Sequence, residues 1–309
     1  MPTLGIDLGG TNARAAVVDE QGRILSSAKL PLAERSPAAV VEVIALAAAE
    51  ALSEARVEVR GCGVGAAGQI HRDSGVLAVA PNLGWRNVPL GAMLTERLGH
   101  PVRVVNDLAA AAWGELNAGA GRGAQDVYVA FVGSGVGSCI IANSQLVRGA
   151  GGVAGELGHT KVIPGGRLCG CGERGCLEAY AGGHNLIAQA RELLSAGRSP
   201  ELARLTGGDP ATLNPVTLEL AAEAGDPAAR EIHERAGQML GMGIANMITV
   251  LNPARLILGG GVLMNCPGLR RYVEEGVRAL SSTVSREHLS INMAELGDDS
   301  GLIGAALLV

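Results

Sequence analysis

The chain has 309 residues, enough for two domains or one large α/β domain. It holds 46 Gly but only two Trp, three Tyr and one Phe, while 48% of its residues are apolar, so a core of Ala, Val, Leu and Ile is expected and disorder is excluded. The net charge of −5, without a run of four basic residues and with so few aromatic rings to stack on bases, disfavours a nucleic-acid partner.

The longest apolar stretch, Met239 to Leu251, contains Asn246 and is shorter than the ~20 residues of a bilayer span, so it predicts a buried helix. The first apolar segment holds Asp7 and has no basic leader, unlike a signal peptide. We therefore expect a soluble cytoplasmic protein without a membrane partner.

The first 30 residues predict a β-meander with strands at Leu4 to Leu8, Ala13 to Val18 and Arg23 to Lys29. Beyond it we expect, in order, a helix at 37–55, a strand at 61–65, a loop around Pro81 to Pro89, a helix near 90–98, a strand at 102–105 and an Ala-rich helix from about Leu108 to Leu116.

A second meander is predicted with strands at 127–132, 138–142 and 145–148. A Gly- and Cys-rich loop at 149–178, mostly helical chain to about Val250, strands at 255–258 and 289–293, and a final helix from about Ser300 follow. Because the order of strand, Gly-rich turn, strand, tight turn, strand occurs twice, we expect two similar α/β domains. We place them at 1–112 and 113–293, with the C-terminal helix at about 294–309 packing back on the first.

The first Gly-rich turn lies in the segment Asp7 to Arg14, where Gly9 and Gly10 precede Thr11 and Asn12. Adjacent glycines let backbone N–H groups converge on an anion, Thr11 adds a hydroxyl donor, and Asp7 can hold a hydrated Mg²⁺. A plain hairpin turn is the alternative interpretation. Because a strand follows the turn, it is neither a Walker P-loop nor a Rossmann fingerprint.

The second Gly-rich turn, Gly133-Ser134-Gly135-Val136-Gly137, repeats this pattern with Ser134 as the hydroxyl donor. Alone it is a weak signal. Two such turns at equivalent positions of two domains could clamp a polyphosphate from both sides.

His159, Cys169, Cys171 and Cys176 have the spacing of a structural metal site. One imidazole and three thiolates make a closed tetrahedral set suited to zinc, with no position open for water. Disulfides are the alternative, which a cytoplasmic protein rarely keeps. The remaining cysteines are interpreted as ordinary thiols: Cys62, Cys139 and Cys266.

Polar residues near these motifs are candidate ligands of a polyhydroxylated molecule. Glu156 and Glu178 flank the metal set, although solvated surface glutamates would have the same spacing. Asn106 and Asp107 close a strand and open a helix, where open α/β sheets bind ligands, and Asp107 could instead simply cap the helix. Beside two phosphate turns, Asp107 becomes the best candidate for a general base.

Together these motifs resemble the ROK family of sugar kinases and related repressors, within the actin, Hsp70 and hexokinase fold superfamily. The most specific match runs from Gly152 to His159 and from Cys169 to Glu178. The resemblance implies a two-domain, actin-like α/β fold of the ribonuclease H-like type with the active site in an inter-domain cleft. It also implies a homodimer or a dimer of dimers.

The resemblance also implies roles for residues. Asp107 is the catalytic base, and the sugar ligands are Asn82, Asn106, Asp107, Glu156, His159 and Glu178. ATP and its phosphates are bound by Asp7, Gly9, Gly10, Thr11, Asn12, Arg14, Gly133, Ser134, Gly135, Gly137, Gly259, Gly260 and Gly261. Zinc is bound by His159, Cys169, Cys171 and Cys176. Ala67, Ala110 and Ser134 depart from the residues most common in the family at their positions.

The leading hypothesis is thus ATP- and Mg²⁺-dependent phosphorylation of a hexose at its 6-hydroxyl, as in glycolysis. The segment Pro81 to Trp85 resembles the family's glucokinases and favours glucose. N-acetylmannosamine kinase, fructokinase and broad hexokinase activities are alternatives. A sugar-sensing repressor would need a helix-turn-helix ahead of Asp7, and an Hsp70-like ATPase leaves the Cys/His loop unexplained.

Overall fold

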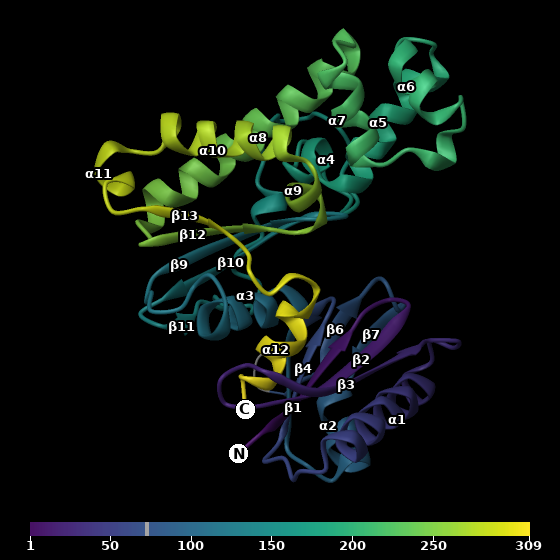
Figure 1. Cartoon of the computed structure of the whole chain (residues 1–309), viewed down its shortest axis with the longest axis vertical. Coiled ribbons are helices and arrows are strands. Elements are labelled where there is room, and N and C mark those ends of the chain that lie inside the picture. Colours follow the sequence, from purple (N-terminus) through teal and green to yellow (C-terminus); the bar gives the residue numbers. More distant parts are fainter. Residues whose placement is uncertain (72–73) are drawn as a thin grey trace. The chain divides into compact units, whose positions relative to one another are not determined.

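A computed structural model of the protein describes residues 1–71 and 74–309. The chain forms two compact units. The first comprises Met1–Gln125, Cys139–Ala154 and Ala294–Val309, and the second comprises Asp126–Ser138 and Gly155–Met293. Figure 1 shows the elements of both in chain order.

The first five-stranded sheet has the order β3-β2-β1-β4-β8. Its strands are β1 (Thr3–Leu8), β2 (Asn12–Val18), β3 (Ile24–Pro31), β4 (Cys62–Ala66) and β8 (Val102–Asn106). The first three strands pair antiparallel, which confirms the predicted meander, whereas β1, β4 and β8 run parallel. The helices between and after these strands are α1 (Pro37–Ala55), α2 (Leu90–Leu98) and α3 (Asp107–Ala118).

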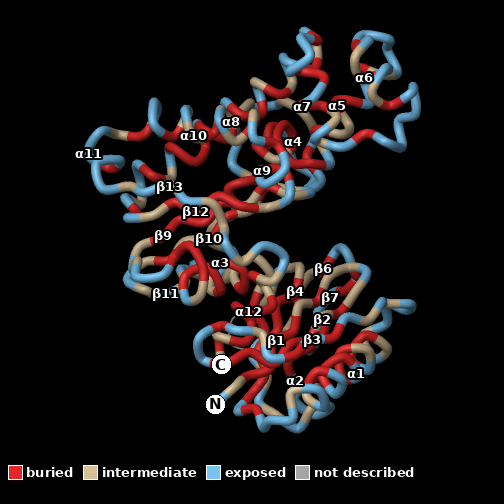
Figure 2. The backbone as a smooth tube through the Cα atoms, in the orientation of Figure 1, coloured by how far each residue is buried: buried red, intermediate tan, exposed pale blue. Residues whose placement is uncertain are grey.

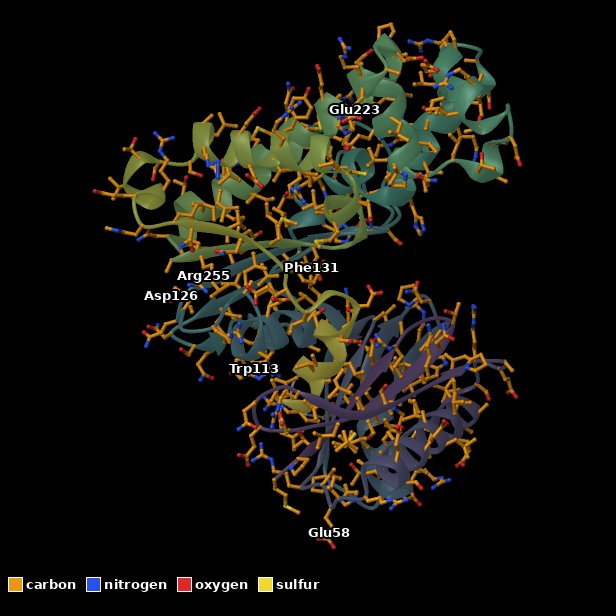
Figure 3. All side chains as sticks on the ribbon, viewed as in Figure 1. Glu58, Trp113, Asp126, Phe131, Glu223 and Arg255 are labelled. Atoms are coloured by element: carbon orange, nitrogen blue, oxygen red, sulfur yellow. The ribbon has the colours of Figure 1, made fainter. Side chains whose placement is uncertain are left out.

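The second five-stranded sheet has the order β11-β10-β9-β12-β13. Its strands are β9 (Val127–Val132), β10 (Val136–Ala142), β11 (Gln145–Leu146), β12 (Arg255–Gly259) and β13 (Ser290–Met293). In both sheets a meander is followed by two parallel strands beside its first strand, so the predicted repeat is confirmed in strand order. Strands β9 and β12 begin together, where the Arg255 N–H donates to the Asp126 carbonyl at 3.3 Å (Figure 3).

Helices make up most of the second unit, as predicted. They are α4 (Glu178–Ala181), α5 (Gly183–Ser195), α6 (Pro200–Thr206), α7 (Pro215–Glu223), α8 (Pro227–Leu251), α9 (Gly261–Asn265), α10 (Pro267–Leu280) and α11 (Thr283–Arg286). The predicted buried helix at 239–251 is the C-terminal half of α8, but one side of it is exposed at Met242 and Val250. No helix in the described part of the chain combines the length and the apolar character needed to cross a membrane.

The prediction of a loop around Pro81 to Pro89 is wrong over residues 85–88, which form a strand. A three-stranded antiparallel sheet forms there from β5 (Gln69–Ile70), β6 (Leu77–Ala80) and β7 (Trp85–Val88). Strands of two to four residues carry too little alternation to be recognised, which is why the pattern missed them. Inside the fold, Trp85 is buried and its indole N–H donates to the Arg35 carbonyl at 2.6 Å.

Buried residues follow the strands and one side of α1 (Figure 2), and the core is built from Ala, Val, Leu and Ile as expected. The last helix, α12 (Ser300–Ala306), packs on β1 and β4 through glycine. A Cβ at Gly5 would lie 2.2 Å from the Leu302 carbonyl oxygen, and one at Gly63 would lie 1.8 Å from that of Ala305. Only residues without side chains allow this helix to lie backbone to backbone on the sheet.

Candidate functional site

The first glycine turn (Gly9–Asn12) connects β1 to β2 at the end where Asp7 lies. The Gly9 N–H donates to the Asn12 carbonyl at 3.1 Å, which closes the turn. Thr11 at its tip is exposed, and Arg14 pairs with Asp7 across the two strands. The turn thus presents a hydroxyl and backbone groups between a carboxylate and a guanidinium.

Asn106 and Asp107 lie where β8 ends and α3 begins. The Asn106 side-chain oxygen accepts from the N–H groups of Leu108 and Ala109 at 3.0 and 3.2 Å, and its amide donates to the Gly68 carbonyl at 3.1 Å. Asn106 is therefore the N-cap, and Asp107 occupies the first position of the helix. An Asp107 carboxylate oxygen accepts from the Leu108 N–H at 2.9 Å.

The parallel ladder brings Asp7 and Asp107 to one edge of the first sheet. Asp7 pairs with Gly65 in β4, and Gly65 pairs with Val105 in β8. A Cβ at Gly65 would lie 3.6 Å from the Asp107 Cα. Carboxyl ends of parallel strands are where open α/β sheets bind ligands.

Burial raises the pKa of both carboxyls above the ordinary 3.8. Burial is the largest cause of the raised pKa of Asp107. Hydrogen bonds to its carboxylate oppose this effect, and the strongest of them comes from the Leu108 N–H. For Asp7 burial is again the largest, Arg14 opposes it, and the charges of Asp107 and Asp298 add to it. The two carboxyls therefore act on one another, and Asp107 holds a proton more strongly than a solvated aspartate does.

Two further groups at this edge were not predicted. Arg14 donates to the Asp298 carbonyl at 2.6 Å and forms an ion pair with the Asp299 carboxylate. The sequence shows two adjacent acids directly before the final helix, but nothing in it identifies Arg14 as their partner. Asn82, by contrast, was predicted, and it lies beside the first glycine turn, since a Cβ on Gly10 would be 3.2 Å from the Asn82 Cβ.

The second glycine turn (Gly133–Gly137) follows β9 and leads into β10. Inside the turn the Gly133 N–H donates to the Gly135 carbonyl at 3.0 Å. The carbonyls of Gly133 and Ser134 accept from the N–H groups of Gly183 and His184, at 2.9 and 3.0 Å, where α5 begins. The turn is therefore anchored through its carbonyl oxygens.

The glycine segment after β12 lies beside this turn. Gly259 pairs with Phe131 of β9, and a Cβ at Gly260 would be 2.5 Å from the Val132 carbonyl oxygen. Gly260 also has a φ of +85°, a conformation that favours glycine, and Gly261 opens α9. The structure thus brings the second glycine turn and Gly259–Gly261 together at one sheet edge.

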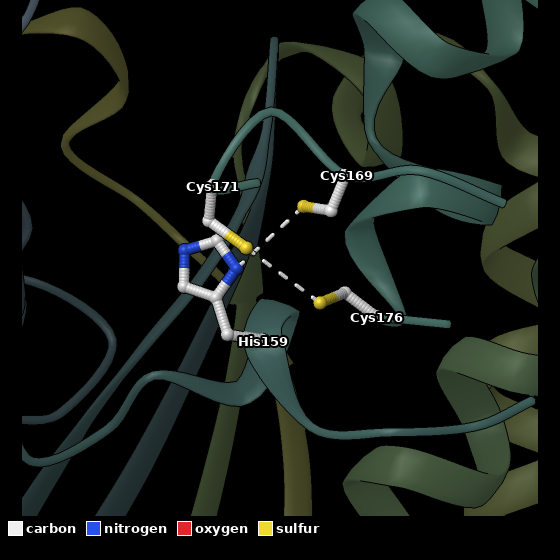
Figure 4. Close-up of side chains that lie close together, drawn as sticks. All are labelled: His159, Cys169, Cys171 and Cys176. Atoms are coloured by element: carbon white, nitrogen blue, oxygen red, sulfur yellow. Dashed lines mark hydrogen bonds between the residues drawn. The ribbon is translucent and has the colours of Figure 1, made fainter. Parts of the chain in front are cut away.

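His159, Cys169, Cys171 and Cys176 come together as predicted, and we call the chain from His159 to Glu178 the cysteine loop (Figure 4). Their four ligand atoms lie within 4.8 Å of one another. The sulfurs of Cys171 and Cys176 are 3.8 Å apart, as are the Cys169 sulfur and His159 Nδ1. A tetrahedral zinc with Zn–S bonds of ~2.3 Å would place two sulfurs ~3.8 Å apart. The donor set and its spacing fit zinc.

Lys161 and Tyr180 support the cysteine loop, and neither belongs to a motif recognised in the sequence. The Lys161 ammonium donates to the Cys176 sulfur and to the His159 carbonyl, both at 3.1 Å, and pairs with Glu173. The buried Tyr180 hydroxyl accepts from the Arg167 N–H at 2.8 Å. One hint existed for Lys161, because the chain contains only two lysines.

The two predicted sugar glutamates of the second unit have different surroundings. Glu156 is exposed, and its carboxylate lies 3.8 Å from His159 Nε2, on the ring side opposite the cluster. Glu178 is half-buried and accepts a hydrogen bond from the Val136 N–H at 2.9 Å.

The three cysteines outside the cluster are buried. Burial raises the pKa of Cys62, Cys139 and Cys266 to about 12. These thiols stay protonated at neutral pH, in agreement with their interpretation as ordinary thiols.

Comparison with known proteins covers the whole chain. The ROK family model matches residues 3–309. The chain is 38% identical to a glucokinase of Streptomyces coelicolor over 98% of its length and 96% of that protein, and 35% identical to an N-acetylmannosamine kinase of Salmonella paratyphi B over 100% and 98%. Its structure is similar to that of a ROK family glucokinase from Streptomyces griseus solved with glucose and AMPPNP, with a TM-score of 0.83, 37% identity and coverage of 100% and 99%. The predicted two-domain, actin-like fold is confirmed.

Proposed function

Because the chain belongs to the ROK family, we propose that it is an ATP-dependent hexose kinase that phosphorylates glucose at its 6-hydroxyl. The observation that carries the proposal is the sheet edge holding Asp107, where a half-buried carboxylate with a raised pKa lies on the same edge as Asp7 and the first glycine turn. A sugar kinase needs such a base beside its phosphate-binding groups.

Asp107 accepts the proton of the attacking hydroxyl. Its position at the start of α3 is fixed by the Asn106 cap, and burial makes it a better proton acceptor than a solvated aspartate. Asn106 already uses its side-chain oxygen in the cap, and one N–H of its amide donates to the Gly68 carbonyl. The second N–H of the amide is the donor left for a sugar oxygen.

Phosphate charge is neutralised by backbone N–H groups and cations. The two glycine turns and Gly259–Gly261 supply N–H groups, with the hydroxyls of Thr11 and Ser134 and the guanidinium of Arg14. Mg²⁺ bound with ATP would supply positive charge to the phosphates, and Asp7 is the residue that would orient its water shell.

The sugar is bound by Asn82, Asn106, Asp107, Glu156, His159 and Glu178. Carboxylates and amides in these positions accept and donate the hydrogen bonds of a polyhydroxylated ligand.

His159 bonds the metal through Nδ1 in this proposal, which leaves Nε2, the atom facing Glu156, for the ligand. Zinc bound by four protein ligands supplies no chemistry to the reaction and fixes the shape of the cysteine loop.

N-acetylmannosamine phosphorylation is the second candidate, favoured by the 35% identity to such a kinase. A coupled assay that follows ADP formation over glucose, N-acetylmannosamine, mannose and fructose separates the two. We expect the highest kcat/KM with glucose. A higher kcat/KM with N-acetylmannosamine would make that sugar the assigned substrate in place of glucose. ADP formation that no sugar accelerates would contradict a sugar kinase.

A further inference from the structure

Glu178 connects the cysteine loop to the second glycine turn. One of its carboxylate oxygens accepts from the Val136 N–H at 2.9 Å, and the other lies 3.7 Å from the Cys169 sulfur. A Cβ on Gly135 would come within 2.4 Å of the first oxygen. The missing side chain at Gly135 therefore lets the carboxylate reach the backbone of the turn.

A second connection follows directly in the sequence. Glu178 begins α4 two residues after the last cysteine, and the Ala179 N–H donates to the Cys176 carbonyl at 3.1 Å. A few residues later, the N–H groups of Gly183 and His184 bond the carbonyls of Gly133 and Ser134. The segment Cys176–His184 thus holds the second glycine turn at both its carbonyl and its N–H groups.

We propose that Glu178 is a positioning residue for the nucleotide, because it holds the second glycine turn in its phosphate-binding shape even when no sugar is bound. This inference rests on the proposed function, in which that turn binds phosphate. A turn with three glycines in five residues loses much conformational entropy when it is ordered. A hydrogen bond to a charged acceptor offsets part of that cost before ATP arrives.

The test measures the Kd of AMPPNP with Mg²⁺ and without sugar, by calorimetry on the full chain. Glu178→Ala removes the acceptor, and we expect about tenfold weaker binding. Glu178→Gln keeps an acceptor oxygen for the Val136 N–H and removes a charge that repels phosphate, so its Kd should equal or fall below that of the parent. Zinc content and melting temperature are recorded for each variant.

Glu156→Gln is the matched control, because Glu156 is the other glutamate assigned to the sugar and has no contact with the second glycine turn among the described interactions. It should weaken glucose binding and leave the Kd of AMPPNP unchanged. If Glu178→Ala does not fold, Glu178→Asp replaces it, since its carboxylate is one methylene shorter and does not reach the turn.

The possible results distinguish a failure of the positioning role of Glu178 from a failure of the proposed kinase function. An unchanged Kd in Glu178→Ala, or in Glu178→Asp where that variant replaces it, contradicts the positioning role alone. Weakening by Glu156→Gln as large as that by Glu178→Ala also contradicts it, because the effect would then follow from the sugar site as a whole. A parent protein that binds no AMPPNP contradicts the proposed function itself.

Discussion

Two regions of the molecule place acidic side chains in very different ways. At the edge of the first sheet, Asp7 and Asp107 are fixed by a regular parallel ladder and a capped helix. Around the cysteine loop, Glu156 lies three residues before His159, and Glu178 is the last residue of the loop. The regular structure between them is one short 3₁₀ turn, Leu157–His159, and two isolated β-bridges.

The two regions are made rigid by different interactions. The half-buried carboxylates of Asp7 and Asp107 are held in place by the ladder and by the capped helix, so their chemistry can be altered without loss of the fold. The cysteine loop is closed by turn-type backbone hydrogen bonds, such as that from the Cys169 N–H to the Glu173 carbonyl at 2.8 Å, in place of a regular ladder. Its shape should therefore depend also on the metal and on the groups that contact its ligands.

The sharpest test of the sheet edge is Asp107→Asn. It should lower kcat by about 10²–10⁴-fold while the melting temperature is kept or raised, because a half-buried carboxyl with a raised pKa is replaced by a neutral group of the same size. Steady-state kinetics and thermal denaturation check both. Asp209→Asn, at an exposed helix cap far from the edge in sequence, is the control. A folded variant that keeps more than about a tenth of kcat would remove Asp107 as the base.

For the cysteine loop the matching change is Cys171→Ala. Cys171 is exposed, so its removal costs no packing, yet it should abolish stoichiometric zinc and lower kcat/KM for glucose by about tenfold or more. Metal analysis of the purified chain is the primary measurement. The control is Cys62→Ala, which removes a buried thiol outside the cluster. This variant should have a lower melting temperature and an unchanged zinc content. Equal zinc in the parent and Cys171→Ala would contradict the metal site.

A smaller effect is expected from Lys161→Met, which removes the ammonium beside the Cys176 sulfur. Charge and hydrogen bonds next to metal ligands commonly change metal affinity by about 10–100-fold, and we expect weaker zinc binding in that range. Competition with a chromogenic chelator measures it. Lys29→Met removes the only other lysine, exposed in β3, and should leave zinc affinity unchanged. Equal affinities in the two variants would show that Lys161 does not support the cluster.

The smallest effect is on the pH dependence of stability. Because the folded chain raises the pKa of Asp107, it binds that proton more tightly than the unfolded chain does. The stabilisation from this carboxyl is fully present below the ordinary pKa of 3.8 and is lost as the pH rises through the raised value. Denaturation at a series of pH values should show a slope of at most ~1.4 kcal/mol per pH unit that Asp107→Asn lacks. Parallel curves for parent and variant would contradict the shift.

Much of the fold followed from local patterns. The two meanders, the helix at 37–55 and the Cys/His cluster each have their signal within a short stretch of sequence, and each was found. The strands of the β5–β7 sheet were too short to show alternation. Contacts that depend on long-range packing, such as those of Arg14 with Asp298 and Asp299, could not be predicted from the sequence.

The glycines show the same limit. Those in the turns were assigned from their neighbours in sequence, but Gly5 and Gly63 look like ordinary strand residues until α12 lies against them. Which glycine serves a ligand and which serves packing is decided by residues hundreds of positions away, and periodicity carries no information about that.

The two tryptophans give the protein an uneven optical response. Trp85 and Trp113 both lie in the first unit, and Figure 3 labels Trp113. The indole N–H of Trp85 donates to the Arg35 carbonyl, and that of Trp113 donates to the Leu307 carbonyl. Intrinsic fluorescence excited at the red edge of protein absorption therefore reports the first unit alone, and Trp85 does so from three positions beyond Asn82, next to the first glycine turn. A ligand that quenches this emission touches or reshapes the first unit, whereas one that leaves it unchanged while binding by calorimetry is held by the second.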